Sequence, residues 1–199
     1  MDTLMYYTKP LSIILLLLIA GCSTSPSKLN QKPSKNTASI SDAEISLYRQ
    51  AITELSQNDL DNAATSFLKM SQAKPNLAGP WANLALIYIK QQQYERADNA
   101  VKTALKNNPN MPQALNLAGV IAEQDGRIDA AQKFYEKALI NKPDYAIAHY
   151  NLALLFDVYL QDISKALPHY QQYMAFSGGS DKNTALWIQE LIYNLENND

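Results

Sequence analysis

The sequence has few of the residues that build reactive and metal-binding sites. Its 199 residues include one cysteine and two histidines. One thiol cannot form an internal disulfide, and His149 and His169 fall in separate expected helices, so no cluster has zinc-ligand spacing. No catalytic constellation and no phosphate-binding loop stands out either. The residues therefore argue against an enzyme, a metal site or a bound cofactor.

A strong excess of charge is also missing. The formal net charge is -2, from 17 basic and 19 acidic residues, and no basic stripe with interleaved aromatic residues occurs. This balance argues against a nucleic-acid partner. The charge is unevenly placed, because residues 23–40 carry three lysines and no acidic residue, whereas acidic residues predominate from residue 41 onward.

Only one long hydrophobic run occurs, at residues 11–20, and it is shorter than the roughly 20 residues that cross a bilayer. Lys9 precedes it and Gly21-Cys22 follows it, as in a secretory signal. The end of this segment, Ile19-Ala20-Gly21-Cys22, resembles the lipobox of bacterial lipoproteins. The resemblance implies a signal peptide at 1–21 and a lipid on Cys22. An ordinary signal peptide with an incidental cysteine is the alternative.

The residues after the cysteine refine this expectation. By the same resemblance, Ser23 in place of an aspartate favours the outer membrane of a bacterium, with the chain facing the periplasm. Residues 22–40 are rich in Ser, Pro, Asn and Lys, so we expect a lipidated cysteine followed by a linker. Such a segment has a mean span of roughly 25 Å. The folded domain would therefore stay near the membrane.

A 34-residue period dominates the rest of the chain. It appears in three prolines, Pro75, Pro109 and Pro143, and in three alanines, Ala63, Ala97 and Ala131. Self-similarity at this period is typical of helical repeat arrays. It divides residues 41–180 into four repeats at 44–77, 78–111, 112–145 and 146–180. Within a repeat, apolar residues recur at helical spacing on two successive segments.

Eight positions of the repeat carry a recognisable pattern. In the second repeat they are Trp81, Leu84, Ala85, Tyr88, Ala97, Val101, Ala104 and Pro109. The pattern resembles the tetratricopeptide repeat. The resemblance implies an all-α fold: a right-handed superhelical array of helix-turn-helix repeats, closed by a capping helix at 181–199. Arrays of this kind hold other protein chains on a concave surface.

Two local features modify the array. Asn58 and Gly126 share the turn position between the two helices of a repeat, where a left-handed residue ends the first helix. In the fourth repeat Ala166 arrives one residue late. One residue is therefore inserted between Phe156 and Asp162, and we expect it to form a loop bulge.

The resemblance also locates a binding groove. In tetratricopeptide arrays the concave face is lined by positions 2, 5, 9 and 12 of each first helix, and in some by position 6. Position 9 forms an apolar strip, which consists of Ile52, Leu86, Val120 and Leu154. Position 12 changes from Leu55 and Ile89 to Glu123 and Asp157, which makes one end of the groove acidic. Related arrays use an asparagine at position 6 to bind a peptide backbone. The candidate groove residues are Tyr48, Ile52, Asn83, Leu86, Asn116, Val120, Tyr150, Asn151 and Leu154.

We therefore expect a membrane-anchored periplasmic scaffold that binds a protein or peptide segment in this groove. Lipoproteins of this kind serve pilus or secretion assembly, outer-membrane protein insertion, or the control of cell-wall enzymes, and the first use is favoured. A different class stays open: the strip could be a homo-oligomer interface, the termini of the chain could cover it, or tight curvature of the array could close it.

Overall fold

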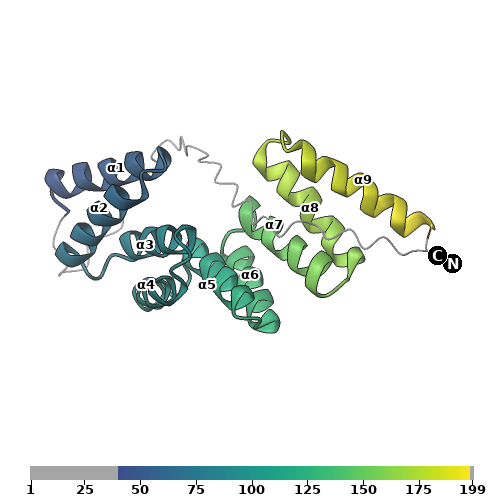
Figure 1. Cartoon of the computed structure of the whole chain (residues 1–199), viewed down its shortest axis with the longest axis horizontal. Coiled ribbons are helices and arrows are strands. Elements are labelled where there is room, and N and C mark those ends of the chain that lie inside the picture. Colours follow the sequence, from purple (N-terminus) through teal and green to yellow (C-terminus); the bar gives the residue numbers. More distant parts are fainter. Residues whose placement is uncertain (1–39, 198–199) are drawn as a thin grey trace, which may run out of the picture. The chain divides into compact units, whose positions relative to one another are not determined.

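The computed structural model describes residues 40–197, in which nine α-helices and one short π-helix follow one another (Figure 1). The expected signal peptide, Cys22 and nearly all of the expected linker lie outside these residues. The all-α array is confirmed. The helices are α1 (Asp42–Ser56), α2 (Leu60–Ala73), α3 (Ala78–Lys90), α4 (Tyr94–Asn107), α5 (Pro112–Gln124), α6 (Ile128–Asn141), α7 (Ala146–Leu154), η1 (Leu155–Tyr159), α8 (Ile163–Ser177) and α9 (Lys182–Asn197).

The helices pack in pairs that follow the chain. α1 packs on α2, α3 on α4, α5 on α6 and α7 on α8, and the second helix of each pair also contacts the first helix of the next. The first helices of neighbouring pairs touch as well, α3 against α5 and α5 against α7. We call the side of the array formed by α1, α3, α5 and α7 the first-helix face.

Local sequence signals set the helix ends. Ser41 and Glu44 form a capping box at the start of α1, and Asp59 and Asp162 cap α2 and α8 through their side chains. The turns inside the pairs use residues of positive φ, which end the first helix. These residues are Asn58 at 58°, Gln92 at 58° and Gly126 at 72°, so the expectation for Asn58 and Gly126 is confirmed.

The fourth repeat accommodates its extra residue inside a helix. The expected loop bulge is wrong, because the chain continues from α7 into the π-turn η1. A π-turn holds one more residue than an α-turn, since its hydrogen bonds join residues five apart, as from the Leu160 amide to the Leu155 carbonyl at 3.1 Å. Gln161, with φ of 53°, then makes the turn into α8.

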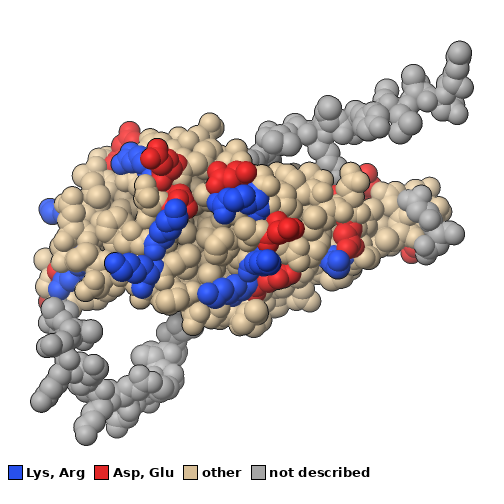
Figure 2. Space-filling view, turned by 90° about the horizontal axis from the view of Figure 1, so that it is seen from below, with Lys and Arg blue, Asp and Glu red and all other residues tan. Residues whose placement is uncertain are grey.

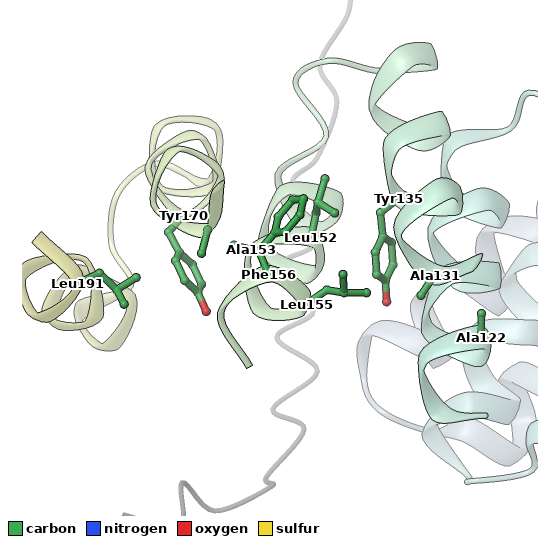
Figure 3. Close-up of a cluster of buried hydrophobic side chains, with 10 residues drawn as sticks. Ala122, Ala131, Tyr135, Leu152, Ala153, Leu155, Phe156, Tyr170 and Leu191 are labelled. Atoms are coloured by element: carbon green, nitrogen blue, oxygen red, sulfur yellow. The ribbon is translucent and has the colours of Figure 1, made fainter. Parts of the chain in front are cut away.

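The core of the array combines small and large side chains. The small residues, Ala51, Ala85, Gly119, Ala153, Ala63, Ala97 and Ala131, are buried, which lets paired helices approach closely. At the C-terminal end, Tyr135 of α6, Phe156 of η1, Tyr170 of α8 and Leu191 of α9 belong to one cluster (Figure 3). Leu191 thereby packs α9 against the last repeat.

None of the helices in residues 40–197 has the length and apolarity needed to cross a membrane.

Candidate protein-binding face

The candidate groove residues all lie on the four first helices. Each helix contributes two or three of them: Tyr48 and Ile52 on α1, Asn83 and Leu86 on α3, Asn116 and Val120 on α5, and Tyr150, Asn151 and Leu154 on α7. Because the first helices lie next to one another, these residues belong to the first-helix face.

The apolar strip is partly open. Ile52, Val120 and Leu154 are half-buried, whereas Leu86 is only 8% exposed. Val120 and Leu154 also pack against the C-terminal core cluster. The strip therefore offers partial apolar surface from the first, third and fourth repeats, while Leu86 serves mainly as a core residue.

The asparagines join neighbouring repeats. The Asn83 Nδ2 donates to the Tyr48 hydroxyl at 3.0 Å, and the Asn151 Nδ2 donates to the Asn116 Oδ1 at the same distance. Gln113 of α5 completes the first group by donating to the Asn83 Oδ1 at 3.1 Å. Position 6 of one repeat thus bonds to position 5 of the repeat before it. Between α3 and α5 these two positions are apolar: Ala82 and Leu117.

The two acidic residues at position 12 are partners of buried tyrosines. The Tyr135 hydroxyl donates to the Glu123 Oε2 at 2.8 Å, and the Tyr170 hydroxyl donates to the Asp157 Oδ2 at 3.3 Å. Burial raises the pKa of Glu123, while hydrogen bonds from Tyr135 and Tyr159 lower it in part. In the first two repeats the same two positions hold apolar residues: Leu55 and Phe67 in the first, and Ile89 and Val101 in the second. The carboxylates at the acidic end of the groove therefore form hydrogen bonds within the protein.

The two tyrosines at position 5 are held from behind by aromatic contacts. The Tyr48 ring meets Phe67 edge-on at 5.6 Å between centroids. The Tyr150 ring lies 4.9 Å from Tyr173 and 6.1 Å from Tyr170, both on α8. Their second helices thus fix the orientation of these side chains, so a ligand on the first-helix face would meet rings that are already positioned.

The structure brings the two histidines together, which the sequence did not predict. His149 is buried, and its Nε2 lies 2.9 Å from the Pro143 carbonyl oxygen. The indole of Trp81, which holds the same repeat position two repeats earlier, donates to the Pro75 carbonyl in the same way at 3.0 Å. The Nδ1 of His149 lies 2.9 Å from the Nδ1 of His169. Helix pairing is the signal that could have found this contact, since α7 and α8 form one repeat.

Charged side chains of both signs are mixed on the face that Figure 2 draws. Figure 2 shows Lys and Arg beside Asp and Glu, without a broad area of one sign on the face drawn. Several are paired, such as Lys165 with Asp162 at 2.7 Å and Arg127 with Asp125 at 2.8 Å. Among the described residues, no three His, Cys, Asp or Glu side chains are grouped to hold a metal ion.

Comparison with known proteins finds a matching family profile and several relatives by sequence. The family profile described as tetratricopeptide repeat matches residues 83–146 and 125–180. The photosystem I assembly protein Ycf3 of Synechococcus sp. (strain CC9605) is 29% identical over 101 residues, which are 46% of this chain and 58% of Ycf3. The uncharacterized protein ycf37 of Cyanophora paradoxa is 31% identical over 47% of this chain and 56% of its own length. The chain thus spans somewhat more than half of these relatives.

Solved structures share the fold. The structure of PilF from Pseudomonas aeruginosa superposes with a TM-score of 0.68 at 18% identity, over 78% of this chain and 70% of PilF. A tetratricopeptide protein of Thermus thermophilus gives a TM-score of 0.63 at 19% identity, over 75% and 81%. Profile, period and fold agree: residues 83–180 match the tetratricopeptide-repeat family, and the helices of residues 40–197 form an array with the same fold.

Proposed function

We propose that this chain is a lipid-anchored, periplasm-facing scaffold that holds an apolar segment of another protein on its first-helix face during assembly of an envelope structure. The anchor is the lipid on Cys22. Pilus or secretion-system assembly is the favoured process, ahead of outer-membrane protein insertion and the control of cell-wall enzymes.

One observation carries the binding site. Ile52, Val120 and Leu154 stand at the same position of their repeats and keep part of their surface exposed. Tyrosines flank them at position 5 of the first and fourth repeats, with rings held in place from behind. A row of partly exposed apolar residues edged by fixed aromatic rings suits an amphipathic helix or an extended apolar segment.

The relatives support an assembly role. Ycf3 is named for the assembly of photosystem I, and PilF shares the helical array over most of both chains. Because the identities are low and the coverage of Ycf3 is partial, these likenesses guide the choice of process to test. The partner itself is described by its chemistry, an apolar segment of a protein.

Site-specific photocrosslinking in cells tests the binding face. The photoreactive residue p-benzoylphenylalanine replaces Arg49, which is exposed and shares its repeat position with Asn83 and Asn151. We expect a crosslinked product whose mass exceeds that of the chain by one partner. The matched control places the same residue at the exposed Lys137 on α6, where we expect no such product.

A groove variant completes this experiment. Ile52→Asp with Leu154→Asp puts charge on the half-buried strip and spares the buried Leu86. The double variant should keep its circular dichroism spectrum and lose the crosslink at residue 49. An unchanged product would rule out the strip as the binding site, and a product of twice the chain mass would indicate self-association instead.

Fractionation of cells tests the anchor. The variant Cys22→Ala removes the only thiol to which a lipid could attach. We expect the wild-type chain in the outer-membrane fraction and the variant in the soluble periplasmic fraction. Cys22→Ser is the matched polar control and should behave in the same way. If both variants stay in the membrane fraction, the lipid anchor is disproved.

A further inference from the structure

The two histidines of the chain meet between the helices of the fourth repeat. His149 belongs to α7 and His169 to α8, and their Nδ1 atoms are 2.9 Å apart. Such a distance is a hydrogen bond, so one Nδ1 must donate and the other must accept. The Pro143 carbonyl settles which one donates. It can only accept, so the Nε2 of His149 at 2.9 Å carries a hydrogen.

These contacts fix the protons of the neutral pair. His149, protonated on Nε2, presents a bare Nδ1, and His169 donates its Nδ1–H to it. One further proton is tolerated, because it can add to the Nε2 of His169 and leave the bond between the rings in place. A second additional proton is excluded, because both Nδ1 atoms would then carry hydrogens and two positive charges would face each other at 2.9 Å.

The surroundings of the pair offer little compensation for a second charge. Phe156 of η1 stacks on the His169 ring, and Phe176 of α8 lies against His149. The charged side chains nearby are Glu136 of α6 and Lys165 of α8, which line a cavity of about 570 Å³ together with His169. Burial and the neighbouring His149 lower the pKa of His169, and Glu136 raises it in part. Lys165 adds a positive charge, although it is paired with Asp162.

We propose that the His149–His169 pair is an acid-sensitive latch that holds α7 on α8 at neutral pH and releases it on acidification. The folded pair binds at most one proton, whereas the two histidines of an unfolded chain bind two. Unfolding therefore takes up a proton below the ordinary histidine pKa of about 6.5, so the fold loses stability as the pH falls. For one excluded proton, the folding equilibrium weakens roughly thirtyfold between pH 7.5 and pH 5.0.

The latch would also control the binding face. α7 carries Tyr150, Asn151 and Leu154, so its release removes the fourth repeat from the first-helix face. This consequence rests on the proposed function, whereas the latch itself does not. An envelope protein outside the cytoplasmic membrane experiences the pH of its surroundings, where such a response has a use.

Nuclear magnetic resonance measures the latch directly, because the full chain has only two histidines. The full chain, labelled with ¹³C on histidine and held in detergent micelles, is titrated from pH 7.5 to 5.0. We expect the pair to take up one proton while folded. The second should enter only as Trp187, on the neighbouring α9, changes its fluorescence. Two independent titrations near pH 6.5 with an intact fourth repeat would overturn the proposal.

A substitution isolates the contribution of the pair. In His169→Gln the amide can donate to a neutral His149 and turn to accept from a protonated one. We expect urea unfolding followed through Trp187 to lose most of its roughly thirtyfold pH effect. The control Gln171→His adds an exposed histidine on α8 and should keep the full effect. An equal pH effect in wild type and His169→Gln would also overturn the latch, whatever the crosslink at residue 49 shows.

Discussion

At the scale of single residues, Gly119 occupies the tightest position in the column of small residues. A Cβ atom added to it would lie 2.3 Å from the Cε1 and 2.6 Å from the Cδ1 of Tyr135, whereas Ala85 and Ala153 fill the same position elsewhere. The Tyr135 ring cannot move aside freely, because it is fully buried and its hydroxyl is bonded to Glu123. Glycine, tyrosine and glutamate therefore form one mutually dependent set in the third repeat.

Gly119→Ala should lower the free energy of unfolding by about 1–3 kcal/mol, because overpacking outweighs the better helix propensity of alanine. Urea denaturation of the purified chain measures this loss. The second repeat supplies the matched control, since it has Ala85, Ile89 and Val101 at these positions. Adding Glu123→Ile and Tyr135→Val to Gly119→Ala should recover most of the stability. A triple variant as weak as the single one would contradict the clash.

At the scale of helices, regular spacing made most of the fold predictable. The 34-residue period predicts the helix pairs, and the turn position of Asn58 and Gly126 predicts the left-handed residues that end first helices. The π-turn η1 was not predictable in the same way. An inserted residue fits either a loop or a wider helical turn, and burial of Leu155 and Phe156 favours the turn that keeps both in the core.

The polar contacts of the first-helix face were harder to predict than its apolar strip. Asn83 and Tyr48 are 35 residues apart, as are Asn151 and Asn116, which is the period plus one residue. The period brings these residues onto adjacent helices but does not say whether their side chains bond to each other or face a ligand. That outcome depends on the separation of the helix axes, which the packing of whole side chains determines.

At the scale of the whole molecule, polar and apolar side chains alternate between the first helices at positions 5 and 6 of the repeats, while Gln113 of α5 adds one polar contact to Asn83 of α3. α1 and α3 are joined by Asn83 with Tyr48, α5 and α7 by Asn151 with Asn116, and the interface between them has apolar side chains at these positions. The stability of a repeat array is close to a sum of repeat and interface terms. Each bonded pair therefore adds to the interface free energy that couples the unfolding of its repeat to that of the neighbouring repeat.

Asn151→Leu should weaken the coupling of the fourth repeat to the third. The Asn116 Oδ1 belongs to a side chain only 3% exposed and would lose the partner that the structure gives it, at a cost of about 1–3 kcal/mol. We expect Trp187 on α9 to report unfolding at a lower urea concentration than Trp81 on α3. Asn116→Ala combined with Asn151→Leu copies the apolar pair Ala82 and Leu117 and should bring the two transitions together again. Coincident transitions in the single variant would show that this bond does not couple the repeats.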